Sequence, residues 1–548
     1  MKQQRTARLC AVVAGLGLLA AACGGDDGGG SSEEAATAAT VDQGVQKGVQ
    51  DALSGSSTTA AEGDDDDAAA AAEPKAHPTT LEDWEALWEE ERAAVVEKIK
   101  DGGYGIAADG KSALISDGYT IDLSACASGW SDTEGLSDTE IKIGHTTAQS
   151  GTLAIYGQIA TAMGLYFADV NKAGGITDSE GKTRTINLIV KDDGYDPART
   201  IPLVDELIDA EKVFAMWTLG SPNTMKTYDK LNQRCIPQPL SMTGHPAWGD
   251  PVKHPWTTGL QLAYNTESVL IGAFIEERAE EFKADDGKII ITSLALNNDA
   301  GKAFDGGVRA WLAQSPIKAD VEYINEVIEP ASPTVTDPMT TLASKNADVF
   351  ISQLGGAACT QAVVEAAQNG MHESVDYLFQ SSVCKSNGFM GKDKVGGDGS
   401  ASEGWWVVGG GLKTFDTAAY DNDPWAKAMR AQLDAAGIDW KTNATHLTGN
   451  AMFAWTAEQA LRIASDLDGG LTRVNFMIAL RNMDMTAPFL LEGAGFNMSG
   501  NKDAYFVEAS EFAQYDAAQQ SFIQQGEVIE LSGKSSNCAW DQSTAACA

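Results

Sequence analysis

From about Glu140 onward, the sequence alternates short strand-like runs with helix-length amphipathic segments. The runs are rich in Ile, Val, Phe or Trp and end near Gly, Ser, Asp or Asn. They are Glu140–Thr147, Thr185–Lys191, Val213–Thr218, Lys288–Leu296, Ala347–Gln353, Tyr377–Ser381 and Trp405–Val408. The helical stretches between them include Tyr156–Ala173, Ala198–Glu211, Thr266–Phe282 and Thr360–Asn369. Strands that alternate with helices predict parallel sheets covered on both faces.

The number of these units decides between one domain and two. The chain has 548 residues, which is too many for a single core, and the alternating region covers about 400 of them. We therefore predict an α/β protein with two doubly wound, Rossmann-like lobes. A closed eight-fold barrel is the structural competitor. The pattern of an antiparallel meander over Ala504–Phe512 and Gln519–Glu530 argues against the barrel.

The first 23 residues have the pattern of an export signal. Lys2, Arg5 and Arg8 precede an apolar run, Leu9–Ala22, which is followed by Cys23. The run is shorter than the ~20 residues that span a bilayer, so it predicts export rather than a membrane span. The four residues before Cys23 (LAAA) complete a segment that resembles the lipobox of bacterial lipoproteins, in which the cysteine is lipidated. An ordinary cleaved signal with an incidental cysteine is the alternative.

Residues 24–80 consist almost entirely of Ala, Gly, Ser, Thr, Asp and Glu and contain no aromatic residue. Such a stretch cannot bury enough apolar surface to offset its ordering entropy, so we predict a disordered acidic tether. An acidic arm with a binding role is the alternative. The net charge of the whole chain is −38. Nucleic-acid binding needs clustered Lys and Arg, so no nucleic-acid partner is expected.

Residues 81–137 are predicted to form an N-terminal extension that stands apart from the alternating region. Trp84, Leu87, Trp88 and Val95 recur at helical spacing among many Glu residues. This pattern predicts an amphipathic helix over 81–99 that packs on the main body.

The cysteines are numerous enough for a set of disulfides. Apart from Cys10 in the signal and Cys23, there are six: Cys126, Cys235, Cys359, Cys384, Cys538 and Cys547. An even count in an exported chain predicts disulfides but leaves many pairings open. Our favoured set is Cys126–Cys235, Cys359–Cys384 and Cys538–Cys547. None of the cysteines has the close paired spacing of a zinc site, and we expect neither a metal nor another cofactor.

Four segments, in the same order, resemble leucine/isoleucine/valine-binding proteins, the substrate-binding subunits of branched-chain amino-acid ABC importers. The segments are 141–157 (IKIGHTTAQSGTLAIYG), 169–176 (DVNKAGGI), 190–197 (VKDDGYDP) and 348–351 (DVFI). The likeness covers roughly residues 138–530. It implies a type 1 periplasmic-binding fold, in which a three-strand hinge joins two lobes. It also implies a protein that captures a small organic ligand and performs no chemistry on it.

The resemblance places one side of a ligand site in lobe 1. In the family, the positions that match Ser221, Ser241 and Thr243 hold a ligand carboxylate, and the position that matches Tyr156 packs on the ligand. Ser150 ends the first strand before a helix, where backbone N–H groups can meet an anion. Loop Ser and Thr residues that only cap helices are the alternative for each hydroxyl.

On the other lobe the sequence departs from the family. The matching positions, where amino-acid binders carry acidic and tyrosine residues, are Gln261, Ala300, Ala357 and Ser382. An ammonium buried there without a carboxylate is costly. We therefore predict a ligand other than a simple α-amino acid, such as a larger carboxylate. A small misalignment would bring in Asp299 or Glu403. Trp217, Trp405 and Trp406 are expected to be core residues, with pocket lining as the alternative.

These observations divide the chain as follows. Residues 1–23 are the signal, 24–80 the tether and 81–137 the extension. Lobe 1 comprises 138–260 and about 405–490, lobe 2 comprises 261–404 and about 491–530, and 531–548 form a C-terminal tail. The expected location is the outer face of the bacterial cytoplasmic membrane, with Cys23 as the only membrane attachment. The expected partners are a small-molecule ligand and an ABC permease, and we expect a monomer.

Two other classes of function fit the sequence less well. The sequence contains no Gly-x-Ser-x-Gly elbow and no His-Glu-x-x-His pattern, so we do not expect an enzyme. A ligand-sensing or structural surface lipoprotein of the same fold is the alternative to transport. Single-chain sensors of this kind usually carry a membrane span and an output domain, and neither pattern occurs here.

Overall fold

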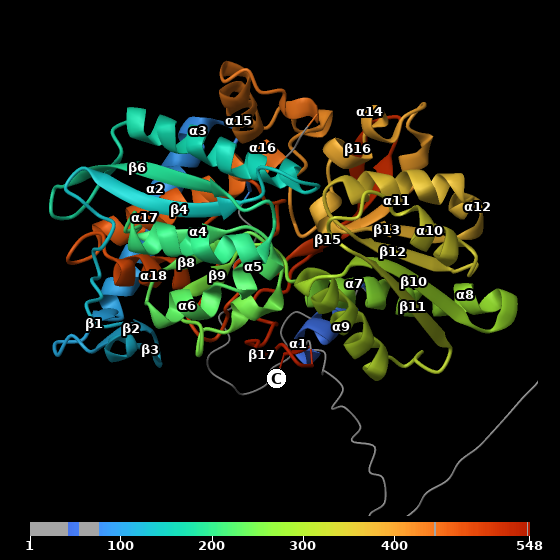
Figure 1. Cartoon of the computed structure of the whole chain (residues 1–548), viewed down its shortest axis with the longest axis horizontal. Coiled ribbons are helices and arrows are strands. Elements are labelled where there is room, and N and C mark those ends of the chain that lie inside the picture. Colours follow the sequence, from blue (N-terminus) through green and yellow to red (C-terminus); the bar gives the residue numbers. More distant parts are fainter. Residues whose placement is uncertain (1–41, 54–75, 443–444, 545, 548) are drawn as a thin grey trace, which may run out of the picture. The chain divides into compact units, whose positions relative to one another are not determined.

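The computed structural model describes residues 42–53, 76–442, 445–544 and 546–547, which lie within one compact unit of residues 39–548 (Figure 1). The predicted export signal and Cys23 lie outside these residues. Within the described ranges, no helix has both the length and the apolar character to cross a membrane. Two separate α/β sheets organise the unit. We call the elements around them lobe 1 (residues 139–260 and 412–507) and lobe 2 (residues 261–411 and 508–531).

The sheet of lobe 1 has the strand order β5-β6-β4-β7. Its strands are β4 (Glu140–Thr147), β5 (Ile176–Thr177), β6 (Thr183–Asp192) and β7 (Ala215–Thr218). β4 runs parallel to β6 and β7, with Ile143 opposite Leu188 and Ala215. The parallel pair β8 (Gln238–Ser241) and β9 (Thr257–Gly259) lies beyond β7, where Leu219 bridges Met242. The connecting helices are α3 (Gln158–Lys172), α4 (Pro197–Asp209), α5 (Ser221–Met225) and α6 (Tyr228–Gln233).

Lobe 2 has a seven-stranded sheet of order β11-β10-β12-β13-β14-β15-β16. The first five are parallel, and the last two are antiparallel to their neighbours. They are β10 (Ile289–Leu296), β11 (Val321–Ile328), β12 (Val349–Gln353), β13 (Tyr377–Gln380), β14 (Trp406–Val408), β15 (Ser510–Asp516) and β16 (Ser521–Ile529). Its helices are α7 (Tyr264–Glu277), α8 (Ala279–Asp286), α9 (Asp299–Gln314), α10 (Thr336–Ala343), α11 (Ala357–Gln368), α12 (Met371–Ser374), α13 (Asn387–Met390) and α14 (Lys392–Val395). The predicted doubly wound fold is confirmed.

Four later helices return to lobe 1. They are α15 (Pro424–Ala435), α16 (Thr445–Thr448), α17 (Trp455–Asp466) and α18 (Arg473–Arg481), with a π-helix at Gly449–Ala454 between α16 and α17. Their apolar faces share one core with β4 and α3. The lobe boundaries differ from those predicted. Trp406–Val408 pairs inside the sheet of lobe 2, whereas Phe496 and Phe506 belong to the core of lobe 1.

The chain passes between the lobes three times: after β9, after β14 and before β15. A buried ion pair joins the second and third crossings to lobe 2. Lys385 Nζ donates to the carboxylate of Glu511 and, at 2.6 Å, to the carbonyl of Leu412. Glu511 Oε2 also accepts from Gly411 N–H at 2.9 Å. The predicted three-strand hinge is therefore present and is fixed around one buried charge pair.

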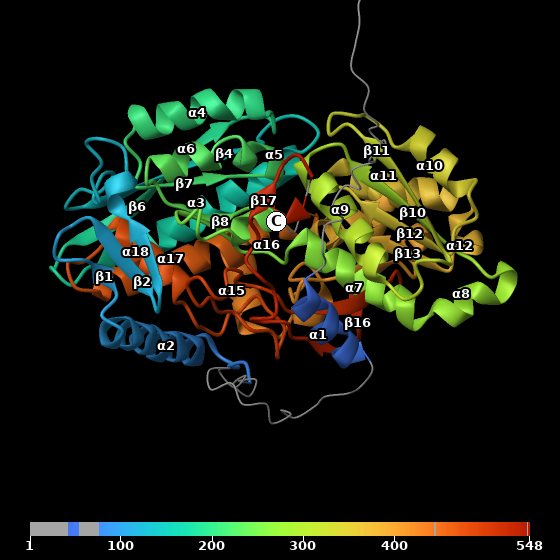
Figure 2. The ribbon, with the colours of Figure 1, turned by 90° about the horizontal axis from the view of Figure 1, so that it is seen from below.

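The N-terminal extension packs on lobe 1, as predicted. Its helix α2 (Leu81–Asp101) buries Trp84, Trp88 and Val95 in the core of lobe 1. Figure 2 shows α2 running beside α17 and α18, with which it is in contact. The extension also holds a small antiparallel sheet that was not predicted, made of β1 (Gly105–Ile106), β2 (Ser112–Ser116) and β3 (Tyr119–Asp122).

Part of the predicted tether is a helix instead. Residues Gln43–Leu53 form α1, whose Val45 and Val49 are buried against lobe 2. Gly44 explains why a helix with few apolar residues docks so closely, because a Cβ there would lie 2.3 Å from the carbonyl oxygen of Lys534. Because residues 24–80 are mostly small or acidic, their overall composition does not indicate a helix with two buried valines. Residues 24–41 and 54–75 of the predicted tether lie outside the described residues.

The C-terminal tail reaches both lobes. Cys538 N–H donates to Gly249 C=O of lobe 1 at 2.7 Å, and Trp540 packs on His245 of lobe 1 and on the core of lobe 2. The tail ends in the hairpin β17 (Trp540–Asp541) and β18 (Ala546–Cys547). All three favoured disulfides are confirmed: Cys126–Cys235, Cys359–Cys384 and Cys538–Cys547.

Candidate functional site

A cavity of about 170 Å³ is lined by residues of both lobes. Many of these residues directly follow a parallel strand. Gly220 lies just after β7, Thr243 after β8, Gly355 after β12 and Ser382 after β13, while Leu296 ends β10. Open parallel sheets place ligands beyond the carboxyl ends of their strands. The cavity therefore lies where both sheets can contribute to one site.

Most of the cavity wall is apolar. One part comes from the strand ends, and a second comes from α3, α16, the π-helix and the segment that follows the second crossing. Apolar lining residues include Leu153, Ile159, Met242, Leu354, Phe389, Phe415, Leu447, Met452, Phe453 and Phe489. The contribution from residues 445–453 was not predicted, because nothing in that helical sequence distinguishes a cavity wall from a core.

The nine site residues expected from the sequence fall into three groups. Those that line the cavity are Tyr156, Thr243, Gln261, Ala300 and Ser382. Ser221 and Ser241 are fully buried beside the cavity but are not part of its lining. Ser150 and Ala357 are exposed and outside the lining. The loop at Ser150 faces Asp192 instead, whose carboxylate accepts from Gln149 N–H at 2.8 Å.

A chain of three hydroxyls runs from Ser221 and Thr243 of lobe 1 to Tyr264 of lobe 2. Ser221 Oγ and Thr243 Oγ1 are hydrogen-bonded at 2.5 Å, and Thr243 Oγ1 lies 3.3 Å from the hydroxyl of Tyr264. Thr243 and Tyr264 line the cavity, whereas Ser221 reaches it only through Thr243. Thr243 is held in place because Trp248 Nε1 donates to its carbonyl at 3.0 Å. This group can offer hydrogen bonds to an anion in the cavity.

Tyr156 connects the two lobes. Its hydroxyl accepts from Gly356 N–H of lobe 2 at 2.9 Å, and its ring lies 6.2 Å from that of Phe389. Burial raises the pKa of Tyr156, so the side chain stays neutral. A side chain in this place can hydrogen-bond to the other lobe and cover a ligand at the same time.

The alternatives in which tryptophan residues, Asp299 or Glu403 line the cavity are not supported. Trp217 and Trp405 are buried in the cores of the two lobes, and Trp406 packs on the core of lobe 2, so none of them lines the cavity. Neither Asp299 nor Glu403 lines it. Among the described residues, the acid in the lining is one that the sequence did not single out, Asp416.

A second unexpected acid, Glu267 of α7, lies behind Ser382. Its carboxylate accepts from Ser382 N–H at 3.0 Å and from Ser382 Oγ at 2.9 Å. Burial raises the pKa of Glu267 to about 7, although the two bonds from Ser382 act in the opposite direction. In the sequence, Glu267 has the context of an ordinary helical glutamate, and no pattern marks it as a buried residue beside the site.

The raised pKa of Glu267 predicts a pH-dependent stability. Between its ordinary pKa of 4.5 and about 7, the unfolded chain has lost the proton that the folded protein keeps. The free energy of unfolding therefore falls as the pH rises through this window and levels off above it. We expect wild type to lose on the order of 3 kcal/mol more than Glu267→Gln between pH 4.5 and pH 8. Urea unfolding of both proteins measures this, and equal pH profiles would contradict it.

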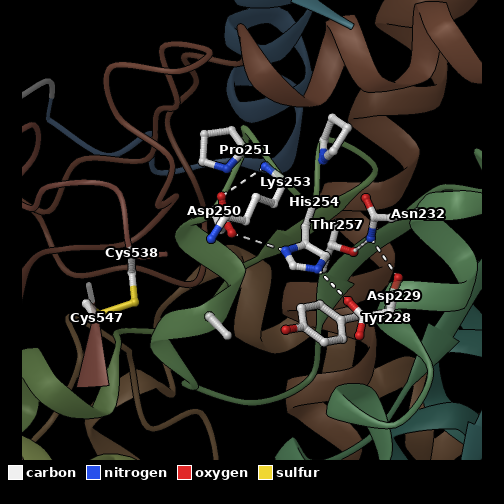
Figure 3. Close-up of polar contacts among 12 residues, drawn as sticks. Tyr228, Asp229, Asn232, Asp250, Pro251, Lys253, His254, Thr257, Cys538 and Cys547 are labelled. Atoms are coloured by element: carbon white, nitrogen blue, oxygen red, sulfur yellow. Dashed lines mark hydrogen bonds and ion pairs between the residues drawn. A yellow bond between two sulfur atoms is a disulfide. The ribbon is translucent and has the colours of Figure 1, made fainter. Parts of the chain in front are cut away.

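A separate cluster of titratable side chains lies around His254 (Figure 3). Its Nε2 lies 2.7 Å from Asp229 and its Nδ1 lies 3.2 Å from Asp250, while the ring stacks on Tyr228 at 4.0 Å. Burial lowers the pKa of His254, but the two carboxylates outweigh it and the pKa is raised. Because carboxylates occupy both ring nitrogens, the histidine has no nitrogen left to activate a nucleophile.

Two lobes, three crossings and a cavity at the strand ends define a two-lobed binding fold. The sequence profile described as periplasmic binding protein matches residues 140–520, and the chain belongs to this family. No curated protein matches the chain at a significant level.

Several solved structures share this fold. One is a fatty acid ABC transporter substrate-binding protein from Thermomonospora curvata, with 17% identity and a TM-score of 0.58 over 73% of this chain and 95% of that chain. Another is a branched chain amino acid ABC transporter protein from Thermus thermophilus with bound valine, with 13% identity and a TM-score of 0.58 over 72% and 97%. A third is a solute-binding protein from Rhodopseudomonas palustris BisB5 with 3,4-dihydroxy benzoic acid, with 16% identity and a TM-score of 0.55 over 71% and 97%. The predicted resemblance is confirmed at the level of family and fold.

Proposed function

We propose that this protein is a lipid-anchored, extracytoplasmic solute-binding protein that closes its lobes around a small, largely apolar carboxylate and delivers it to an ABC permease. The observation that carries the proposal is the cavity at the ends of both parallel sheets, with an apolar wall and the hydroxyl chain of Thr243 on one side. Membership of the periplasmic binding protein family supports it.

The cavity supports binding rather than catalysis. Among the described residues, the lining contains no histidine and no cysteine, so it lacks the usual base and thiol nucleophile. The hydroxyls of Thr243 and Tyr264 belong to a chain whose members bond to one another. A site of this kind can hold an anion.

The lobe 2 side of the cavity favours a ligand larger than a simple α-amino acid. Ala300 leaves room where a larger side chain would close the site, and Gln261 and Ser382 are neutral. The Glu267 carboxylate behind Ser382 is already bonded twice, and with a pKa of about 7 it is only partly ionised near neutral pH. One solved structure of the same fold is named a fatty acid ABC transporter substrate-binding protein, and two others are in complex with benzoate and 3,4-dihydroxy benzoic acid, which supports an acid of this kind as the ligand class.

The proposed cycle follows from the hinge. Each lobe contributes part of the cavity, so a ligand that contacts both stabilises the closed arrangement by its differential affinity. The closed protein then docks on a permease, whose ATPase drives release. Export and lipidation at Cys23 would keep the protein at the outer face of the cytoplasmic membrane.

A thermal-shift screen with purified protein tests the ligand class. The panel contains straight-chain fatty acids, aromatic acids, and branched-chain and aromatic amino acids. A ligand at 100 times its Kd adds about 2.7 kcal/mol to the stability of the folded state, which produces a measurable rise in Tm. A shift with the acids alone supports the proposal. A shift with leucine or valine alone would show that the ligand is the common amino-acid type and would overturn the ligand class.

Thr243→Val is expected to weaken the binding of the best acid at least tenfold. Valine keeps the shape of the side chain but removes the hydroxyl that faces the cavity, and a hydrogen bond to a charged group contributes about 1.5–3 kcal/mol. Calorimetric titration measures the change. Thr341→Val on the exposed surface of α10 is the matched control and should leave the affinity unchanged. Equal affinities for wild type and Thr243→Val would show that the hydroxyl of Thr243 does not contribute to ligand binding.

A further inference from the structure

The charged side chains of the cavity differ in how well they are paired. Three charged residues line it: Lys385, Lys413 and Asp416. Lys385 is paired with Glu511, and Lys413 Nζ donates to Asp423 at 2.7 Å. Asp416 has no cationic partner among the described residues. It lies in the segment after the second crossing, and only 6% of it is exposed.

One oxygen of Asp416 is satisfied and the other is not. Oδ2 accepts from Ser386 Oγ at 3.0 Å and from Asn387 N–H at 2.6 Å. Oδ1 is buried and has no hydrogen-bond partner among the residues that the structure describes. A buried acceptor without a partner is destabilising, and more so when it is charged. Burial raises the pKa of Asp416, although the hydrogen bonds from Ser386 and from backbone N–H groups act in the opposite direction.

A second cavity residue has the same deficit. Gln353 at the end of β12 is 4% exposed, and its Oε1 also lacks a hydrogen-bond partner. Gln353 and Asp416 come from different parts of the chain, yet both line the cavity. Both unpaired groups are acceptors, whereas the hydroxyls of Thr243 and Tyr264 can donate. Thr243 and Tyr264 can therefore supply donors to a ligand in the cavity, and Asp416 and Gln353 can supply acceptors.

We infer that Asp416 forms a second polar subsite, which takes a hydrogen-bond donor of the ligand. On this inference, the ligand is an apolar carboxylate that also carries a hydroxyl or amino group, with the carboxylate at Thr243 and the donor at Asp416. The inference rests on the proposed function, because it assumes that the cavity holds a carboxylate. It excludes a dicarboxylic acid, whose second anion would face the Asp416 carboxylate.

The test uses pairs of acids that differ only in the donor. Suitable pairs are octanoate with 8-hydroxyoctanoate and 8-aminooctanoate, and benzoate with 4-hydroxybenzoate and 4-aminobenzoate. We expect the wild-type protein to bind the substituted member of at least one pair tenfold or more tightly than its parent, as measured by calorimetry. This comparison needs no variant, so it does not depend on how a substitution folds.

Asp416→Asn assigns the preference to this side chain. The amide keeps one oxygen for Ser386 and Asn387 and replaces the unpaired oxygen by a donor of the same shape. We expect it to weaken binding of the substituted acid at least tenfold while the parent acid changes less than about threefold. Asp434→Asn, on the exposed surface of α15, is the matched control and should change neither affinity.

The outcomes separate the two proposals. If the parent acids bind and no substituted acid binds more tightly, the subsite is overturned while the proposed function stands. If the preference exists but survives in Asp416→Asn, another group of the protein accepts the hydrogen bond from the ligand, and the inference is wrong. If neither member of any pair binds, the carboxylate function is overturned, and this inference with it.

Discussion

Replacing Cys126 and Cys235 together by serine should lower the free energy of unfolding by about 5 kcal/mol, because this disulfide closes a long loop. The two cysteines are 109 residues apart and tie the N-terminal extension to the start of β8. Removing the bridge enlarges the conformational entropy of the unfolded chain. It also loosens the loop in which Trp130 Nε1 donates to Cys235 C=O at 2.9 Å.

Cys538→Ser with Cys547→Ser is the matched control. That bridge closes a sequence separation of only 9 residues, so the same chain-entropy relation gives a loss of about 2.7 kcal/mol. Urea unfolding under non-oxidising and non-reducing conditions, followed by tryptophan fluorescence, compares the two double variants. Equal losses, or a larger loss for the short loop, would contradict loop closure as the origin of the effect.

Lys385→Met should destabilise the ligand-free protein by about 3–5 kcal/mol, because it leaves Glu511 charged and buried. The carboxyl side chain of Glu511 is 1% exposed and lies between two of the three crossings. Its remaining bond from Gly411 N–H does not neutralise the charge. The measured quantity is the free energy of unfolding in urea, and wild type and variant are compared without ligand.

Two further variants separate the charge effect from lost packing. Lys385→Met with Glu511→Gln removes both charges and should recover most of the stability lost in the single variant. Lys191→Met breaks a partly exposed pair with Glu206, whose carboxyl side chain is 45% exposed, and should cost far less stability than Lys385→Met. If the double variant is as unstable as Lys385→Met alone, the buried charge is not the cause.

Several interior strands could be predicted from the sequence because most of their side chains are buried. Glu140–Thr147 coincides with β4, and Val349–Gln353 lies within the predicted run 347–353. The strand β11 was missed, because Glu322, Asn325 and Glu326 interrupt its apolar pattern. It is an edge strand that pairs only with β10, so most of its side chains remain partly exposed. Local pattern identified the longer buried strands, but it missed this edge strand and the short strands β8 and β9.

The site was predictable only in part. Ser382 follows a strand that the pattern predicts. Thr243 and Gln261 follow β8 and β9, which were not among the predicted strands, and they were identified through the family resemblance; all three residues line the cavity. Asp416 and the wall at residues 445–453 come from segments that reach the cavity through tertiary packing. Nothing near Asp416 in the sequence marks it as buried, because its burial depends on Ser386 and Asn387, about 30 residues earlier.

The docking of α1 limits how far the protein can stand from a membrane. A tether over residues 24–80 would reach roughly 200 Å when fully extended. With α1 fixed on lobe 2, the stretch between Cys23 and Gln43 can span at most roughly 70 Å. In the proposed lipid-anchored protein, the shorter stretch between Cys23 and Gln43 therefore connects lobe 2 to the membrane. On that proposal, the height at which the cavity could meet a permease would be set by α1 rather than by the whole acidic segment.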